Sequence, residues 1–186
     1  PHIEKLYVIS VNNECKELLL FINKKYNAET QIHAINLKST INNQQTTDNP
    51  TPFSGFISHE SALSLSYAHE VGKYLYEPYA AHLKSGLYKT LAEKYNVKKL
   101  HQHSHLYTST ELNNDFPGRK FEVKEVVPFD KKSAKTLFNS LKQANLTTRN
   151  FPLTVSQLRT QYKIKDGGDT YIFATTLHDD SKVFII

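Results

Sequence analysis

The residues with the clearest chemical potential lie between positions 131 and 165, where basic side chains occur without a single Asp or Glu. The whole chain has a formal net charge of +5, so the rest of it is roughly neutral or slightly acidic. A field of one sign attracts polyanions such as nucleic acids. Two solvated helix faces that carry lysine would produce the same composition. The basic residues of this window are Lys131, Lys132, Lys135, Lys142, Arg149, Arg159, Lys163 and Lys165.

Two arginines stand next to an aromatic residue in segments that read as loops. Arg119 follows Phe116, and Arg149 precedes Phe151. A guanidinium can grip a phosphate at two points, and an aromatic ring can stack on an unpaired base. An arginine that anchors a turn would explain each pair equally well. Together with the lysines, these arginines predict an RNA-binding set made of Arg119, Lys131, Lys135, Lys142, Arg149, Arg159 and Lys163.

Three histidines, at positions 101, 103 and 105, alternate along the chain and would share one face of a strand. Neutral imidazoles suit zinc or nickel. However, no cysteine or nearby carboxylate completes a coordination shell, so we do not expect a metal site. Whether His101, His103 and His105 bind a metal stays open at this point.

Other candidate reactive groups have simpler explanations. Cys15 would be activated if it lay at a helix N-terminus, but Glu14 and Glu17 oppose a thiolate there. We expect Cys15 to be a buried helix residue. The segment 166–169 reads as a tight turn and not as a calcium loop. No glycine-rich phosphate loop and no Ser-His-Asp arrangement is recognisable, so this chain alone does not look catalytic.

The first region of the chain predicts a strand–helix–strand unit. Residues 5–11 form a continuous apolar run typical of a buried strand, and residues 31–37 predict a second strand. Asn12 and Asn13 would cap a helix between them, with Leu18, Leu19, Phe21 and Ile22 on its buried face. Residues 38–51 predict a polar loop, and residues 52–58 a short antiparallel strand that returns beside 31–37. The abrupt start of the first strand suggests a piece of a longer protein.

The remaining residues predict two further regions. In the second, a helix starts at Glu77-Pro78 and runs to about Tyr95, followed by a short strand or extended segment at 97–106. In the third, 120–127 predicts a strand, 131–144 a helix and 146–151 an extended segment. A helix capped by Thr154, a turn at 166–169 and strands at 170–177 and 182–186 complete it. The order β-α-β-α-β-β predicts a small sheet with two helices on one side.

Six short motifs resemble one family: residues 12–19, 74–78, 105–109, 116–119, 147–152 and 165–169. They are similar to the C-terminal part of a Bacteroidetes group of class I SAM-dependent methyltransferase-like proteins. The resemblance implies an α/β (α+β) fold with three parts: the last strands and helix of a Rossmann-like sheet at 1–58, a ferredoxin-like segment at 67–110 and a THUMP-like domain at 116–186. THUMP domains are associated with RNA in tRNA- or rRNA-modifying enzymes. The family's SAM-binding glycine loop has no counterpart here and would lie upstream, so no catalytic or cofactor residue carries over.

The function expected from these observations is RNA recognition within a SAM-dependent tRNA or rRNA methyltransferase. S-adenosylmethionine would bind the full-length protein, and we expect no cofactor on this fragment. The alternative is a non-catalytic basic module that docks an acidic protein. One cysteine and no apolar stretch of membrane-spanning length predict a cytoplasmic chain without a membrane anchor. An exposed sheet edge would permit a homodimer.

Overall fold

The computed structural model describes residues 2–38 and 52–186, so nearly all of the predicted polar loop at 38–51 lies outside the described residues. The chain has a mixed α+β fold with three four-stranded sheets among these residues. It divides into two compact units, each assembled from separate segments. Unit 1 contains residues 1–65, 78–96 and 115–119, and unit 2 contains 66–77, 97–114 and 120–186. None of the helices in the described ranges is both long and apolar enough to cross a membrane.

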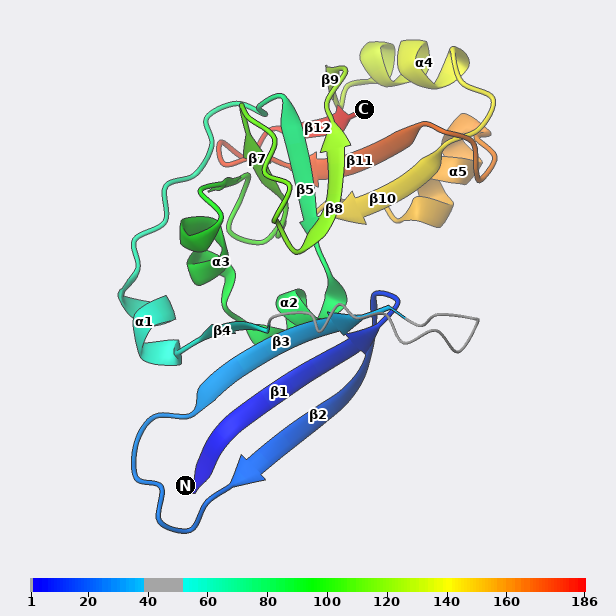
Figure 1. Ribbon diagram of the computed structural model, residues 1–186. Helices are drawn as coiled ribbons and strands as arrows, with labels where there is room; N and C mark the ends of the chain where they lie inside the picture. The colour runs from blue at the N-terminus through cyan, green and yellow to red at the C-terminus, as the bar shows by residue number, and fades with distance from the viewer. Residues whose placement is uncertain (1, 39–51) are drawn as a thin grey trace. The chain divides into compact units, whose positions relative to one another are not determined.

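The sheet of unit 1 has the order β2-β1-β3-β4, drawn in blue to cyan in Figure 1. β1 (Ile3–Val11) runs parallel to β3 (Gln31–Leu37). The edge strands β2 (Glu14–Ile22) and β4 (Phe53–Gly55) are antiparallel to β1 and β3, respectively. The predicted strands at 5–11 and 31–37 and the antiparallel return after Pro52 are therefore confirmed.

The predicted helix after Asn13 is wrong, because residues 14–22 form strand β2 of a hairpin with β1. Asn12 and Asn13 have φ angles of 49° and 66°, which is the left-handed conformation required at both centres of a type I′ turn. Asparagine tolerates this conformation better than most residues. Instead of forming the buried face of a helix, Leu18, Leu19, Phe21 and Ile22 are exposed on β2. Cys15 is also exposed, and not buried in a helix.

Three short helices, α1 (Ile57–Ala62), α2 (Ala80–Ser85) and α3 (Tyr88–Lys94), complete unit 1. The single helix predicted from Glu77 to Tyr95 is wrong in two respects. Pro78 ends a strand instead of starting a helix, and Gly86 breaks the helical run with a left-handed φ of 78°. The N-terminus of α3 is capped from α1, because the buried Glu60 carboxylate accepts hydrogen bonds from the backbone N–H groups of Lys89 and Thr90, each at 2.8 Å.

The first sheet of unit 2 has the order β6-β7-β5-β8. Its strands are β5 (Tyr74–Pro78), β6 (Lys98–Lys99), β7 (Tyr107–Ser109) and β8 (Gly118–Glu122). Only two residues of the predicted extended segment 97–106 belong to a strand. The histidines lie in the turn that follows, where His105 has a left-handed φ of 52°. They do not alternate along one strand as predicted.

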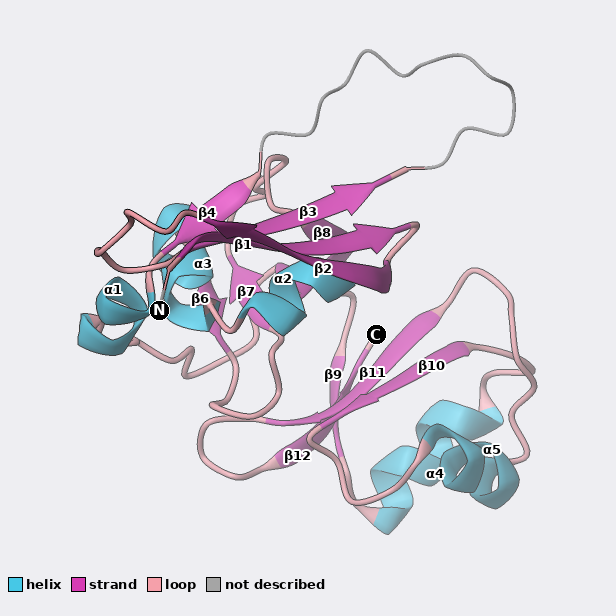
Figure 2. Cartoon of the chain, turned by 90° about the horizontal axis from the view of Figure 1, so that it is seen from below, coloured by secondary structure: helices cyan, strands magenta, loops and turns pink. Residues whose placement is uncertain are grey.

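The second sheet of unit 2 has the order β10-β11-β12-β9 and confirms the predicted β-α-β-α-β-β sequence. The predicted strand 120–127 is in fact two strands, since β8 ends at Glu122 and β9 belongs to this second sheet. Figure 2 shows α4 and α5 on the same side of the sheet. The elements in chain order are β9 (Val126–Pro128), α4 (Lys131–Asn139), β10 (Asn145–Arg149), α5 (Val155–Tyr162), β11 (Tyr171–Thr176) and β12 (Lys182–Ile185).

Both faces of β11 and β12 are buried: one face packs against the two helices, and the other packs against the first sheet of unit 2. Ile172 and Phe184 pack with Ala134, Phe138 and Leu158 of the helices in one cluster. The alternate residues Phe173 and Val183 belong to a second cluster with the first sheet of unit 2. The members of this second cluster are Ala68, Leu75, Leu100, Leu106, Phe173, Val183 and Ile185.

Candidate nucleic-acid interface

The basic face of α4 follows from helical spacing. Lys131, Lys135 and Asn139 stand four residues apart, so their side chains line up along one side of the helix. Asp130 starts the helix, because its carboxylate accepts hydrogen bonds from the backbone N–H groups of Lys132 and Ser133, both at 2.9 Å. The hydrogen bonds from Ser133 hold the pKa of Asp130 below its usual value, so this carboxylate stays ionised.

The C-terminus of α5 supplies the second side of the interface. The helix begins with a capping box between Thr154 and Gln157, as the predicted Thr154 cap requires. It ends at Lys163, whose φ of 56° turns the chain out of the helix. The half-buried Tyr162 ring stacks on Phe138 of α4, with centroids 4.3 Å apart and planes inclined by 13°. Burial and the nearby Asp130 raise the pKa of Tyr162, which keeps its phenol protonated.

A groove of about 620 Å³ opens between these two helix ends. Three of the predicted RNA-binding residues, Lys131, Lys135 and Lys163, line it together and are exposed. The one carboxylate in the lining is Asp130, and it is occupied at the N-terminus of α4. Three ammonium groups around one groove concentrate positive charge there, which attracts anions. The remaining lining residues are Phe129, Asn139, Gln161 and Tyr162.

The other four predicted residues do not line this groove. Arg149, at the end of β10, is paired with the buried Glu77, with Nη2 2.7 Å from the carboxylate. Arg159 of α5 forms an ion pair with Asp166 and donates a hydrogen bond to the carbonyl of Ala144. Lys142 is exposed in the turn after α4, and Arg119 is half-buried on β8 in the segment assigned to unit 1.

The aromatic rings beside Arg119 and Arg149 are packing residues. Phe116 is 1% exposed and meets Tyr95 edge to face, with ring centroids 5.6 Å apart. Phe151 packs against Phe129 and Phe184 at 4.7 Å and 5.6 Å. Phe116 is therefore too buried to stack on a base, whereas Phe151 is half-buried and packs against the core of the second sheet.

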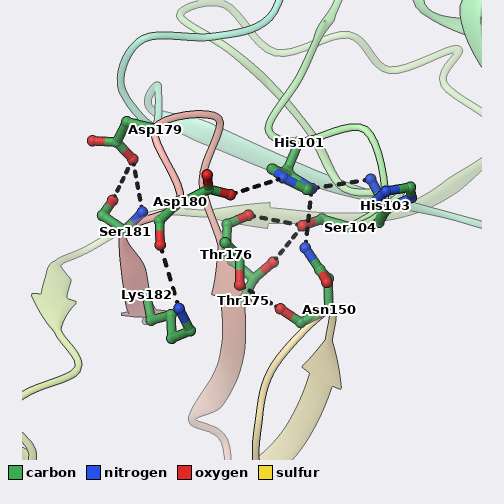
Figure 3. Close-up of polar contacts among 10 residues, drawn as sticks. All are labelled: His101, His103, Ser104, Asn150, Thr175, Thr176, Asp179, Asp180, Ser181 and Lys182. Atoms are coloured by element: carbon green, nitrogen blue, oxygen red, sulfur yellow. Dashed lines mark hydrogen bonds and ion pairs between the residues drawn. The ribbon is translucent and has the colours of Figure 1, made fainter.

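The histidine segment forms a polar network with the ends of β10 and β11, shown in Figure 3. Nδ1 of His101 accepts hydrogen bonds from the Asn150 side chain at 3.0 Å and from the backbone N–H of His103 at 3.1 Å. This arrangement places the ring proton on Nε2, which lies 3.5 Å from Asp180. Ser104 donates to the carbonyl of Thr176 at 2.8 Å.

The same histidines do not converge with other ligands into a metal-binding group in the described part of the chain. Within residues 2–38 and 52–186, no group of three or more His, Cys, Asp or Glu side chains has a geometry that could hold a metal ion. His105 is kept neutral, because burial first and then the charges of Lys99 and Arg149 lower its pKa to about 4. The network ties the turn to the second sheet instead.

The glycine at the end of a strand that precedes a helix, Gly55, does not offer the open backbone that a nucleotide cofactor such as S-adenosylmethionine needs. Gly55 is the last residue of β4, and α1 begins two residues later. A Cβ atom at Gly55 would lie 3.0 Å from Leu87 Cδ1 and 3.4 Å from Thr90 Cγ2, so its open side is filled by side chains of the protein. A glycine that cradles a nucleotide presents free backbone to the ligand. No residue of this chain is therefore assigned a role in the chemistry of this cofactor.

The sequence pattern pointed to the lysines of the groove but not to the residues between them. Tyr162, Gln161 and Asn139 carry no motif of their own. Two sequence features could have revealed them. One is the four-residue spacing that places Asn139 in line with Lys131 and Lys135, and the other is the aromatic residue directly before Lys163. Their convergence depends on how α5 packs against α4, which a periodicity does not specify.

Two consecutive parts of the chain match models of known domain families. Residues 74–117 match a family model described as a ferredoxin-like domain, and residues 118–186 match one described as THUMP domain-like. No curated protein matches the chain. In a crystal structure, a protein from Porphyromonas gingivalis W83 described as a "putative methyltransferase" shares 36% sequence identity and a TM-score of 0.89. The match covers 99% of this chain and 45% of that one. Residues 74–186 are thus similar to a ferredoxin-like domain followed by a THUMP-like domain.

Proposed function

We propose that this chain is the RNA-recognition part of an RNA-modifying methyltransferase that acts on tRNA or rRNA. The THUMP-like domain would hold the RNA, and residues outside this chain would bind S-adenosylmethionine and perform the transfer. Residues 1–58 would be the final strands of the methyltransferase sheet, with the hairpin β1–β2 in place of the predicted strand–helix–strand unit.

The observation that carries the proposal is the groove between α4 and α5. It collects Lys131, Lys135 and Lys163 in a domain whose class is associated with RNA. Polyanion binding through exposed lysines needs little rearrangement, since the charges already point into water. Arg149 and Arg159 are paired with Glu77 and Asp166, so the proposal assigns the direct RNA contacts to the three lysines.

Support for the methyltransferase part comes from the similar protein of Porphyromonas gingivalis. Its chain extends well beyond the region matched here, because this chain covers 45% of it. We expect no binding of this cofactor by the chain alone, as measured by isothermal titration calorimetry.

The test is fluorescence anisotropy of this chain with a labelled structured RNA and a DNA duplex of matched length, across a series of salt concentrations. We expect preference for the RNA and a steep loss of affinity with salt. Lys131→Glu with Lys135→Glu should weaken RNA binding at least tenfold. The matched control is Lys24→Glu with Lys25→Glu, which reverses two exposed lysines of unit 1.

Three outcomes of this test would contradict the proposal. Equal weak binding to RNA and DNA would indicate a basic surface without a preference for RNA. RNA affinity that survives the reversal of Lys131 and Lys135 would remove the groove from the interface. Saturable, nuclease-resistant binding to one acidic protein, without RNA affinity, would favour the alternative of a protein-docking module.

A further inference from the structure

The groove between α4 and α5 has an aromatic wall as well as charged rims. Tyr162 and Phe129 line it beside the three lysines. One face of the Tyr162 ring is covered by Phe138, which is buried and does not line the groove. Phe138 thus fixes the plane of the tyrosine ring, while the part of Tyr162 that reaches the groove is left for a ligand.

Amide side chains complete this lining. Asn139 ends the polar stripe of α4, and Gln161 precedes Tyr162 on α5. An amide carries both donors and acceptors, which is what the edge of an unpaired base presents.

Size and chemistry together select the ligand. A volume of about 620 Å³ lies in the range that encloses a ligand of drug-like size, and one nucleotide is of that size. A double helix offers phosphates to the lysines but keeps its bases stacked inside, out of reach of Tyr162. A single-stranded nucleotide offers a phosphate and a base face at the same time.

We infer that this groove binds an unpaired nucleotide of the RNA, with its base stacked on Tyr162 and its phosphates held by Lys131, Lys135 and Lys163. Asn139 and Gln161 would contact the edge of the base. This inference rests on the proposed function and adds to it that single-stranded segments are preferred over paired ones.

A direct test uses the absence of tryptophan from the whole chain. Tyr162→Trp places a single indole at the proposed stacking position, and its fluorescence reports on base stacking. We expect quenching when a single-stranded oligoribonucleotide is added and none with an RNA duplex of the same length. An indole that responds equally to both probes, or to neither while RNA is bound, overturns the inference.

Affinity measurements separate stacking from charge. Tyr162→Leu should weaken binding of the single strand roughly tenfold and leave duplex binding unchanged, whereas Tyr162→Phe should retain the single-strand affinity. Tyr171→Leu is the control, because Tyr171 lies on β11 and does not line this groove. Thermal melting of each variant shows whether loss of the contact with Phe138 has unfolded the domain.

The outcomes distinguish this inference from the proposed function. RNA binding that depends on the lysines but not on Tyr162 would overturn the stacking role and leave RNA recognition standing. Complete absence of RNA binding by the unmodified chain would overturn both.

Discussion

The Arg149 guanidinium donates two hydrogen bonds to one oxygen of the Glu77 carboxylate, from Nε at 3.2 Å and from Nη2 at 2.7 Å. The Glu77 side chain is 4% exposed and that of Arg149 is 39% exposed. A nearby cation stabilises a carboxylate this deeply buried, because the charge has lost most of its hydration. Arg149 is therefore a structural residue of unit 2, joining β10 to β5.

We predict that Arg149→Ala lowers the free energy of unfolding by about 2–3 kcal/mol, toward the low end for a broken buried pair because the arginine is partly solvated. Urea unfolding followed by circular dichroism measures this. Lys142→Ala, which removes an exposed cation from the same basic window, should leave stability within about 0.5 kcal/mol. An Arg149→Ala variant of normal stability that loses RNA affinity would instead place Arg149 in the interface.

The slope of RNA affinity against salt concentration should reflect how many lysines of the groove contact phosphates. Each phosphate contact with single-stranded RNA contributes about 0.7 to the slope of log K against log salt. Replacing Lys131, Lys135 and Lys163 by alanine should therefore reduce the magnitude of the slope by about 2. Removing three lysines outside the groove should change it less. An unchanged slope in the groove variant would show that these ammonium groups do not contact phosphates.

Sequence patterns were sufficient where a local signal and the tertiary environment agree. The Thr154 N-cap, the Gly167-Gly168 turn and the apolar, β-branched residues of β11 all act locally, and these elements occur where predicted. The prediction was wrong for residues 14–22 because five apolar residues in a row fit a buried helix face as well as a strand. The turn at Asn12 and Asn13 determines that these residues form a strand, because its left-handed φ angles reverse the chain into a hairpin. The hydrophobic periodicity of the sequence does not reveal those angles.

The candidate site was predictable in its charge and not in its geometry. Seven basic residues were expected to act together, and three of them line one groove. In the folded structure, Arg149 and Arg159 pair with Glu77 and Asp166, two acidic residues that lie outside the segment 131–165. Glu77 is 72 residues from Arg149 in the chain, so only the folded structure reveals the pair.

The turn between β1 and β2 provides a test of backbone strain at one position. Asn13 has a φ of 66°, and its side-chain oxygen accepts a hydrogen bond at 2.7 Å from the backbone N–H of Ala80, the first residue of α2. Both Asn13→Gly and Asn13→Ala remove this hydrogen bond, but glycine adopts the left-handed conformation freely, whereas alanine keeps a Cβ atom there and lacks the tolerance of asparagine for it. We expect the alanine variant to be less stable than the glycine variant by about 1 kcal/mol in thermal melting. Equal stabilities would contradict the type I′ turn.

His82 should make unit 1 sensitive to acid. Burial, with a smaller contribution from the charge of Lys94, lowers the pKa of His82 to about 4 from an ordinary value of 6.5. Between these two values the unfolded chain binds a proton that the folded chain does not. Stability is therefore complete above pH 6.5 and falls as the pH drops towards 4, by up to about 3 kcal/mol.

The measurement is urea unfolding at pH 7 and at pH 4.5 for the unmodified chain and for His82→Gln. The glutamine variant should lose less stability between the two pH values, because it has no proton to bind at this position. The pKa of His105 in unit 2 is also lowered to about 4, so this residue should destabilise the chain in the same pH range. Its contribution remains in the His82→Gln variant, and the difference between the two proteins therefore reports on His82 alone. A pH dependence that is the same with and without His82 would contradict its burial in the neutral form.

Strand β2 should make the isolated chain prone to self-association. It is one of the two edge strands of the unit 1 sheet, and Leu18, Leu20 and Ile22 are 65%, 53% and 64% exposed. An edge with free backbone groups and apolar side chains is a template for pairing with a second strand, which is the basis for the expected homodimer. We predict that sedimentation velocity will show concentration-dependent dimers and that Leu20→Lys will abolish them, because a lysine on each strand introduces repulsion. Leu112→Lys, at a leucine of unit 2 that is 45% exposed, is the control and should leave the dimers intact. A chain that stays monomeric at all concentrations, or dimers that tolerate Leu20→Lys, would exclude β2 as the pairing edge.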